Sequence, residues 1–343
     1  IKDGKFIAVG SNNEVEKVTG DDTEVVDLKG SFAMPGVQEN HVHATCAGAT
    51  IEKYTGRLVI SRTDTPKEIQ QKVVEYAKAN PGDGWIRGQT WGTGHFEDGR
   101  ARKGFLDEVM PDRPVILLDE SVHLAVANSK ALEMAGITKD TPQPVGGVIE
   151  KDPETGEPTG FLADWGMFPV LKINPPATPE QWRKAIVDSR DLLHTYGVTA
   201  YTDAICNREV LQAYRDMDTE GVLKMRVDCN IMMTDYQADV IEPWKIIEDR
   251  EQYRSRLVDP SRAKWGADGI PLSKSSVMLE PYIGDPQNYG ILGLEEREME
   301  NFEIIFGKGM QLMVHTIGDG TTRKVLDYVE KARVAHPDNK RPV

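Results

Sequence analysis

The stretch MPGVQENHVHA, residues 34–44, places two histidines one residue apart, shortly after a Pro-Gly pair. The Pro-Gly pair is typical of a turn, and the residues after it predict a β-strand over 36–43. Alternate side chains of a strand face the same side, so His41 and His43 are expected to point together. Two converging imidazoles suit a divalent transition metal such as Zn²⁺. From the pair alone, packing of one ring and solvation of the other is an equally good interpretation.

The sequence after residue 165 alternates helices and strands regularly. Repeated units of this length predict an α/β protein with a parallel sheet. Together with strand 36–43 they supply five strands, which we interpret as part of a (β/α)8 TIM barrel that lacks about three strands. The expected helices cover 178–196, 207–220, 239–254, 294–307 and 319–333, and the expected strands cover 197–204, 224–233, 262–269 and 310–318.

Two other segments depart from this pattern. Residues 1–33 alternate short apolar runs with turn residues and predict part of a small β-sandwich, which begins with a strand, an Asp-Gly turn and a second strand. Residues 34–343 then form the incomplete barrel. Within it, residues 50–165 lose the regular alternation, so we expect an inserted α+β subdomain that covers the barrel mouth. Its expected elements are a helix over 66–79, a strand over 113–121, a helix over 128–136 and a hairpin over 146–164.

Composition narrows the class of partner. The net charge is −14, with 41 basic and 55 acidic residues and no basic block, which argues against nucleic acid or an anionic membrane surface. No apolar run approaches the length of a membrane span, so we expect no transmembrane helix. We therefore expect a small-molecule substrate, and homo-oligomerisation stays open.

Cysteine usage bears on the compartment. Cys46, Cys206 and Cys229 lie far apart without CxxC spacing, which favours a reducing compartment such as the cytoplasm. Residue 1 is Ile and not Met, so we expect the N-terminus to be cut, and an export signal further upstream stays open.

A third histidine strengthens the metal interpretation. His315 stands near the end of the expected strand 310–318, as His41 and His43 do in strand 36–43. Parallel strands of a barrel end at the same face, so the three imidazoles are expected at one mouth. We therefore predict that they bind a metal.

Several stretches resemble the amidohydrolase superfamily, and within it the amidohydrolase-3 subgroup of YtcJ-like and N-substituted formamide deformylase-like enzymes. MPGVQENHVHA resembles the first-strand signature of the family, although Glu39 stands where an aspartate is usual, and IKDGKFIAVG resembles the β-sandwich beside those barrels. The resemblance extends from end to end. It also rests on DEVMPDRPVILLDESVHLAVANSKALEMAGI, DPETGEPTGFL, ADGIPLSKSSVMLEPY and VHTIGDGTTRKVLDYVEKA.

The resemblance implies a metal centre at the carboxyl ends of the strands. His41 and His43 match the first-strand ligands and His315 matches the fifth-strand ligand. Lys264 matches the fourth-strand lysine, which is often carbamylated so that it bridges two metals. The sixth-strand histidine and the eighth-strand aspartate, the general base of the family, have no counterpart and are expected beyond Val343.

The implied reaction is hydrolysis of a C–N bond in an amide, N-acyl or formamide-like compound by metal-activated water. His123 aligns with a family histidine near the substrate pocket. Trp91, in a predicted glycine-rich loop that could overhang the barrel mouth, and Asp268, after Lys264, are further candidates for substrate binding. Two alternatives stay open: a deaminase with a single metal on the three histidines without Lys264, and a noncatalytic scaffold of the same fold.

Overall fold

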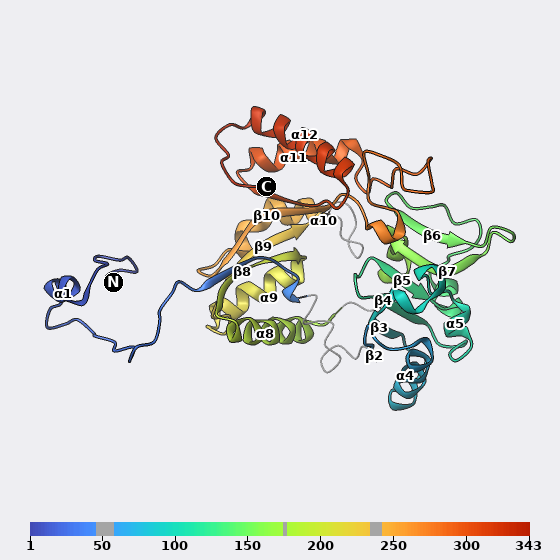
Figure 1. Cartoon of the computed structure of the whole chain (residues 1–343), viewed down its shortest axis with the longest axis horizontal. Coiled ribbons are helices and arrows are strands. Elements are labelled where there is room, and N and C mark those ends of the chain that lie inside the picture. The colour runs from blue at the N-terminus through green and yellow to red at the C-terminus, as the bar shows by residue number, and fades with distance from the viewer. Residues whose placement is uncertain (46–57, 174–176, 234–241) are drawn as a thin grey trace. The chain divides into compact units, whose positions relative to one another are not determined.

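The strand that contains His41 and ends just before His43 is the first strand of a parallel sheet. The computed structural model describes residues 1–45, 58–173, 177–233 and 242–343 (Figure 1). Cys46 and the start of the predicted insertion lie outside the described residues. The chain divides into two units, Ile1–Gly36 and Val37–Val343, which are described separately below.

The first unit contains only short elements. Asp3 and Gly4, both at positive φ, form the predicted turn, and the two residues that flank it exchange backbone hydrogen bonds of 2.9 Å. No strand extends from this turn, and none of the residues 1–36 is buried. A sandwich is stable only when a second sheet covers its apolar face, and within this unit Phe6 and Phe32 are 75% and 88% exposed. The sandwich therefore stays a prediction; the elements formed are α1 (Asn12–Val15) and the 3₁₀ helix η1 (Glu16–Val18).

The second unit contains the predicted parallel sheet. Its strand order is β1-β8-β9-β10-β11, and every neighbouring pair is parallel. This confirms the α/β class and the five strands expected from the sequence. The strands are β1 (Val37–Val42), β8 (Val198–Cys206), β9 (Arg226–Met232), β10 (Val258–Gly266) and β11 (Gln311–His315).

β10 begins four residues earlier than predicted, because Pro260 hid its first half. Proline has no N–H to donate and is confined in sheets to edges, strand starts and bulges. The register between β9 and β10 shifts between Asp259 and Arg262, which places the proline at such an irregularity.

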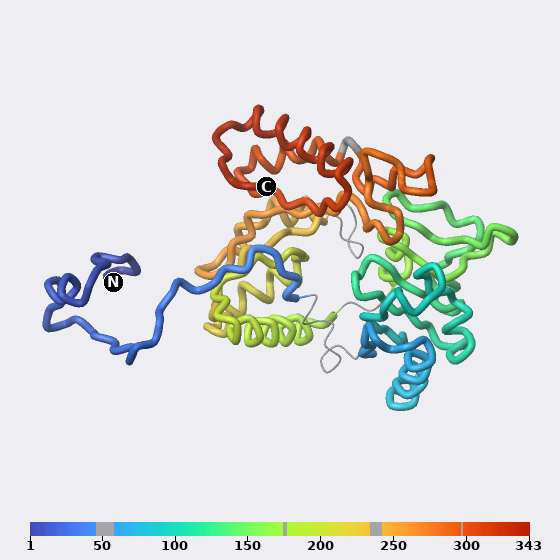
Figure 2. The backbone as a smooth tube through the Cα atoms, in the orientation of Figure 1, coloured from blue at the N-terminus to red at the C-terminus, as the bar shows by residue number. Residues whose placement is uncertain are grey.

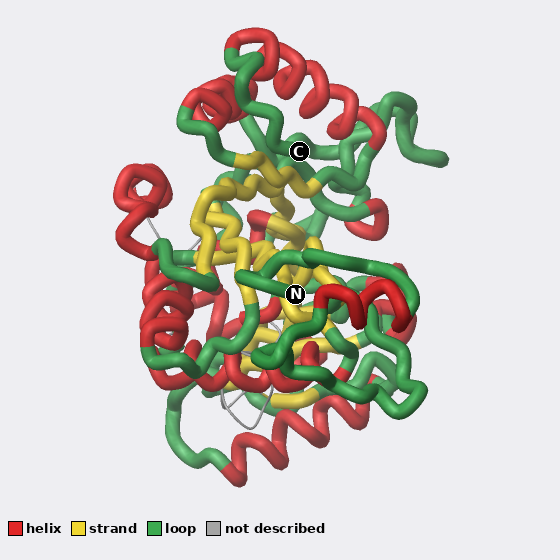
Figure 3. Tube along the Cα trace, turned by 90° about the vertical axis from the view of Figure 1, so that its left-hand side faces the viewer, coloured by secondary structure: helices red, strands yellow, loops and turns green. Residues whose placement is uncertain are grey.

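Helices alternate with these strands along the chain, and their buried apolar residues join those of the strands in one core. Figure 3 shows helices in red beside the strands in yellow. Their starts follow from capping chemistry: the Thr178 side chain accepts a hydrogen bond from the Gln181 N–H, and Asn207 accepts one from Val210. The helices are α8 (Pro179–Thr195), α9 (Arg208–Thr219), α10 (Glu242–Asp249), η5 (Arg250–Tyr253), α11 (Glu296–Gly307) and α12 (Asp319–Ala335).

The segment between β1 and β8 forms a second sheet. β1 and β8 pair directly, so the intervening chain is inserted between sheet neighbours; Figure 2 traces it in cyan and green. The strand order is β2-β3-β4-β5-β7-β6; β2, β3 and β4 run parallel, and the other pairs are antiparallel. The strands are β2 (Leu58–Val59), β3 (Ile86–Trp91), β4 (Val115–Asp119), β5 (Leu124–Ala127), β6 (Gly147–Lys151) and β7 (Pro158–Asp164).

This second sheet has its own apolar core, made of two clusters separate from that of the parallel sheet. The predicted strand near 113–121, the hairpin and both helices are present. β3 was not predicted, because its sequence IRGQTW contains polar residues and a glycine and lacks the apolar pattern of a strand. That the insertion covers the barrel mouth stays a prediction. Its helices are α4 (Pro66–Ala79), η2 (Thr93–His95), η3 (Glu97–Gly99), α5 (Gly104–Asp107), α6 (Ser129–Met134), η4 (Trp165–Met167) and α7 (Phe168–Lys172).

Among the described residues, no helix combines the length and the apolar character that crossing a bilayer requires.

Candidate metal and substrate site

The two histidines of β1 lie side by side. His41 is the penultimate residue of β1 and His43 follows the end of the strand; their ring centroids are 5.3 Å apart. Glu39 accepts a hydrogen bond of 2.9 Å from the backbone N–H of His41, so its carboxylate is tied to its own strand. Both histidines keep contact with solvent. The carboxyl end of β1 therefore presents two neighbouring imidazoles that are accessible to solvent.

Lys264 and His315 lie on the two neighbouring strands β10 and β11. His315 is the last residue of β11 and pairs with Gly266, two positions beyond Lys264. Lys264 is only 4% exposed. Within the described residues its side-chain amine makes no hydrogen bond or ion pair, and burial lowers its pKa to about 8. A buried amine with this pKa is partly neutral near physiological pH.

The charges of neighbouring side chains affect the pKa values of His43 and His315. Desolvation, and after it the positive charges of His41, Lys264 and His123, lower the pKa of His43 to about 4. The pKa of His315 also falls to about 4, first through desolvation and then through His123 and Lys264. Both imidazoles are neutral at physiological pH, which is the form that binds a metal.

The donor atoms fit a transition metal by their chemistry. The Nε2 atom of His315 is buried, and no described residue makes a hydrogen bond with it. An unpaired imidazole nitrogen in its neutral form is a common metal ligand. Within the described ranges, no group of three or more His, Cys, Asp or Glu side chains is assembled around one point. The structure thus brings the histidines together in pairs, and a three-histidine centre stays a prediction.

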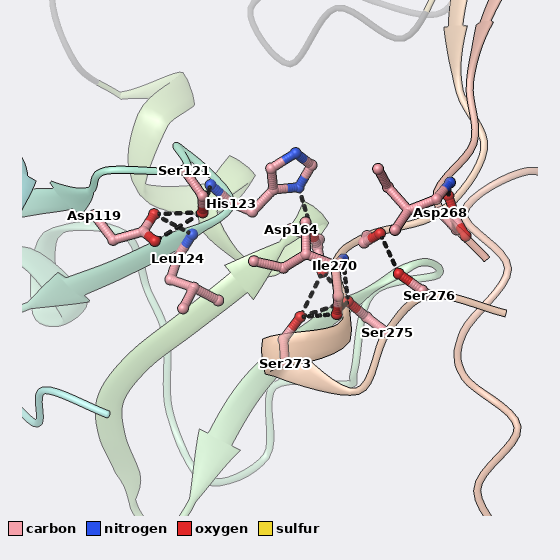
Figure 4. A network of polar contacts seen from close by, with 12 residues as sticks. Asp119, Ser121, His123, Leu124, Asp164, Asp268, Ile270, Ser273, Ser275 and Ser276 are labelled. Carbon is pink, nitrogen blue, oxygen red and sulfur yellow. Dashed lines mark hydrogen bonds and ion pairs between the residues drawn. The ribbon is translucent and has the colours of Figure 1, made fainter. Parts of the chain in front are cut away.

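His123 reaches this neighbourhood from the second sheet. Its ring stacks on that of His315, with the centroids 5.1 Å apart and the planes inclined by 28°. Its Nδ1 lies 2.7 Å from Oδ1 of Asp164, and its side chain is 26% exposed (Figure 4). The structure therefore places His123 beside a predicted metal ligand, and its contact with substrate stays a prediction.

Asp164 is a residue of this site that sequence reasoning missed. It ends β7, is buried, and accepts hydrogen bonds at Oδ2 from the hydroxyls of Ser275 (2.5 Å) and Ser273 (3.5 Å) (Figure 4). Its partners are separated from it by 41 residues (His123) and 111 residues (Ser275). No local spacing could have indicated these contacts.

Asp268 joins the loops that follow β10 and β11. Its buried carboxylate accepts hydrogen bonds from the backbone N–H groups of Val277, Ile317 and Gly318, and from the Thr321 hydroxyl at 2.6 Å. These bonds hold the loops together and occupy the carboxylate with protein donors. A substrate contact by Asp268 stays a prediction.

Trp91 is a core residue and not part of a loop. It is the last residue of β3 and is 1% exposed. Its indole N–H donates a hydrogen bond of 3.0 Å to the carbonyl of Leu117, and its ring meets that of Phe96 edge to face. Packing thus accounts for the residue, and nothing in this placement supports the predicted substrate contact.

Asp203 supports the segment that follows His43. It lies near the end of β8, fully buried, and accepts hydrogen bonds from the Tyr214 hydroxyl (2.7 Å) and the Thr45 hydroxyl (3.0 Å). Burial raises its pKa to about 6. Since Thr45 is two residues from His43, this carboxyl group helps to position the end of β1.

The sequence of the chain is similar to those of two curated proteins. The chain is 30% identical to the putative amidohydrolase YtcJ of Bacillus subtilis, over 96% of this chain and 62% of that protein. It is also 30% identical to the N-substituted formamide deformylase of Arthrobacter pascens, over 97% of this chain and 62% of the relative. The chain thus spans less than two thirds of the length of these curated relatives.

The fold also matches a solved structure. An uncharacterized metal-dependent hydrolase from Pyrococcus horikoshii OT3 superposes with a TM-score of 0.67 at 22% identity, covering 96% of this chain and 63% of that one. The model of the amidohydrolase family, Amidohydro_3, matches residues 24–343. The chain therefore belongs to the amidohydrolase family.

Proposed function

We propose that the protein containing this chain is a metal-dependent hydrolase that cleaves a C–N bond of an amide, N-acyl or formamide-type small molecule. The observation that carries the proposal is the buried, unpaired Nε2 of His315 beside Lys264, a buried amine without a partner among the described residues. Family membership and the names of the relatives support it, since two of them are called an amidohydrolase and a formamide deformylase.

The metal would be held by His41, His43 and His315, with Zn²⁺ as the expected ion because imidazole suits it. Lys264 would join them as a carbamate, an anionic oxygen donor that can bridge two ions. The five parallel strands would belong to a (β/α)8 barrel. When bound, the metal supplies a Lewis acid that lowers the pKa of water and polarises a carbonyl group.

The residues of this chain prepare the site in separate ways. Desolvation keeps His43 and His315 neutral, so that their nitrogen lone pairs are free. The lowered pKa of Lys264 makes neutral amine available, and only the neutral amine reacts with CO2 to form a carbamate. Asp203 and Asp268 hold the loops around these side chains through bonds to Thr45, Ile317 and Gly318.

The test uses the full-length protein loaded with Zn²⁺ in the presence of bicarbonate. Release of amine from a panel of simple amides and formamides is the expected result. Lys264→Ala should lose metal and activity, and short carboxylic acids should restore part of both. The matched control is Lys308→Ala, since Lys308 is exposed at the end of α11.

Two outcomes would contradict the proposal. A folded, metal-loaded protein that releases amine from none of these compounds would remove the C–N hydrolase assignment. Full metal content and activity in Lys264→Ala would remove the carbamate and support the single-metal arrangement.

A further inference from the structure

We propose that Asp164 is a positioning residue: it holds His123 as the Nδ1–H tautomer, so that Nε2 accepts a hydrogen bond from an N–H group of the substrate. The inference rests on the proposed function for the identity of the substrate. The relation between Asp164 and His123 stands on geometry alone.

The contact between the two side chains determines the tautomer. An ionised carboxylate has only acceptors, so a hydrogen bond to an imidazole nitrogen requires the proton on that nitrogen. The distance of 2.7 Å between Nδ1 and Oδ1 is that of a strong hydrogen bond. In the neutral ring, Nε2 then carries the lone pair.

The surroundings of Asp164 hold its carboxylate in this direction. The hydroxyls of Ser275 and Ser273 donate to Oδ2, which leaves Oδ1 to face His123 (Figure 4). Gly269 leaves room for this arrangement, because a Cβ there would lie 2.1 Å from both Oδ2 and the Ser275 hydroxyl. Asp164 itself has φ 49° and ψ −125°, a conformation that non-glycine residues adopt rarely and at a cost.

The ring of His123 lies beside the candidate site. The ring stacks on His315, and its side chain is partly exposed. No described residue makes a hydrogen bond with Nε2, which points away from Asp164 in Figure 4. A lone pair at this position recognises an N–H donor, so the favoured substrates are amides that carry a hydrogen on nitrogen.

The first experiment reads the tautomer without catalysis. Two-bond 1H–15N spectra of the full-length, metal-free protein with 15N-labelled histidine are recorded over a pH series, and the tautomer is taken from the high-pH limit of the His123 resonances. His123→Gln assigns the resonances. We expect Nδ1 protonated and Nε2 unprotonated in the native protein, and the Nδ1–H form reduced to a minority in Asp164→Ala. Asp164→Asn, which presents a donor as well as an acceptor, should show the Nε2–H form as well.

Asp218→Asn is the matched control, since Asp218 is another buried carboxyl group and accepts its hydrogen bonds from Ser255 and Leu257. It should leave the tautomer unchanged. A native spectrum that shows Nε2–H would overturn the proposal even if the variants fail to fold. Retention of the Nδ1–H form in both Asp164 variants would overturn it as well.

The second experiment tests the ligand with the zinc-loaded, full-length protein. N-methylacetamide, which has an N–H group, should shift the Nε2 resonance of His123, and N,N-dimethylacetamide should not. Equal effects of both probes, or no effect of either, would overturn the substrate half of the proposal. Because neither experiment requires turnover, failure of the hydrolase assignment is distinguishable from failure of this inference.

Discussion

The two sheets of the second unit contribute to the site by different means. In the parallel sheet, strand direction alone brings His41 and His315 to the same edge, because parallel strands end together. In the mixed sheet, His123 and Asp164 meet across the antiparallel pair β5 and β7, and Asp164 reaches Ser275 only through tertiary packing. Topology therefore places the predicted ligands, whereas individual contacts place the residues around them.

This difference leads to an expectation about mutations. Substitutions at the edge of the parallel sheet should change metal binding and the pH dependence of stability. A core substitution in the mixed sheet that leaves the His123 contacts intact should change stability alone. The predictions below start with the largest effect.

Removal of the histidine pair should have the largest effect. In the full-length protein, His41→Ala/His43→Ala should weaken metal binding by more than about 100-fold, since loss of a residue that only orients a ligand already costs 10–100-fold. Elemental analysis and metal titration measure it. His194→Ala, at an exposed position near the end of α8, is the control. Unchanged metal content in the double variant would show that His41 and His43 do not bind the metal, although the parallel strands bring them to the same end of the sheet as His315.

Lys264→Met should make the metal-free protein more stable. The fold lowers the pKa of Lys264 from 10.5 to about 8, which corresponds to about 3 kcal/mol against the charged form. This penalty is complete below the folded pKa and disappears as the pH rises through 10.5. The variant should therefore exceed the native protein by about 3 kcal/mol at about pH 7 and by nothing above pH 10.5, as measured by urea unfolding. A variant less stable at neutral pH would mean that Lys264 is paired in solution.

Asp203→Asn should change the pH profile of stability. The fold raises the pKa of this carboxyl group from 3.8 to about 6, so its penalty is absent below pH 3.8 and complete above pH 6. The free energy of unfolding of the variant, relative to the native protein, should rise by about 1 to 3 kcal/mol between about pH 4 and about pH 7. Parallel pH profiles for the two proteins would refute the raised pKa.

Trp91→Phe should have the smallest effect and leave function intact. It removes the hydrogen bond to the Leu117 carbonyl and should cost about 1 kcal/mol of stability, with KM unchanged. Thermal unfolding and steady-state kinetics check both. A several-fold rise in KM without loss of stability would restore the substrate contact that the sequence suggested.

Local patterns were sufficient for most of the parallel sheet. The period of two in a strand predicted that His41 and His43 would lie together, and their rings are 5.3 Å apart. Pro260 concealed the start of β10, because bulges depend on the neighbouring strand as much as on local propensity.

Local sequence patterns could not predict the side-chain contacts of the mixed sheet. Asp164 meets His123 and Ser275 only after the chain has folded, and a single sequence has no signal for contacts at these separations. Trp91 was misread for a related reason: the glycines on both sides of it indicated a loop, but β3 pairs with β4 and buries the ring. Burial of this kind depends on tertiary neighbours and not on local composition.

The backbone of Asp164 bears on how this protein would respond to laboratory evolution. Its φ of 49° is unfavourable for a residue with a Cβ, by on the order of 1–3 kcal/mol, whereas glycine adopts it readily. A library at this position selected for thermal resistance alone should therefore enrich glycine, and one selected for turnover should retain aspartate. Different enrichment under the two selections would show that aspartate at this position lowers stability and is retained for activity.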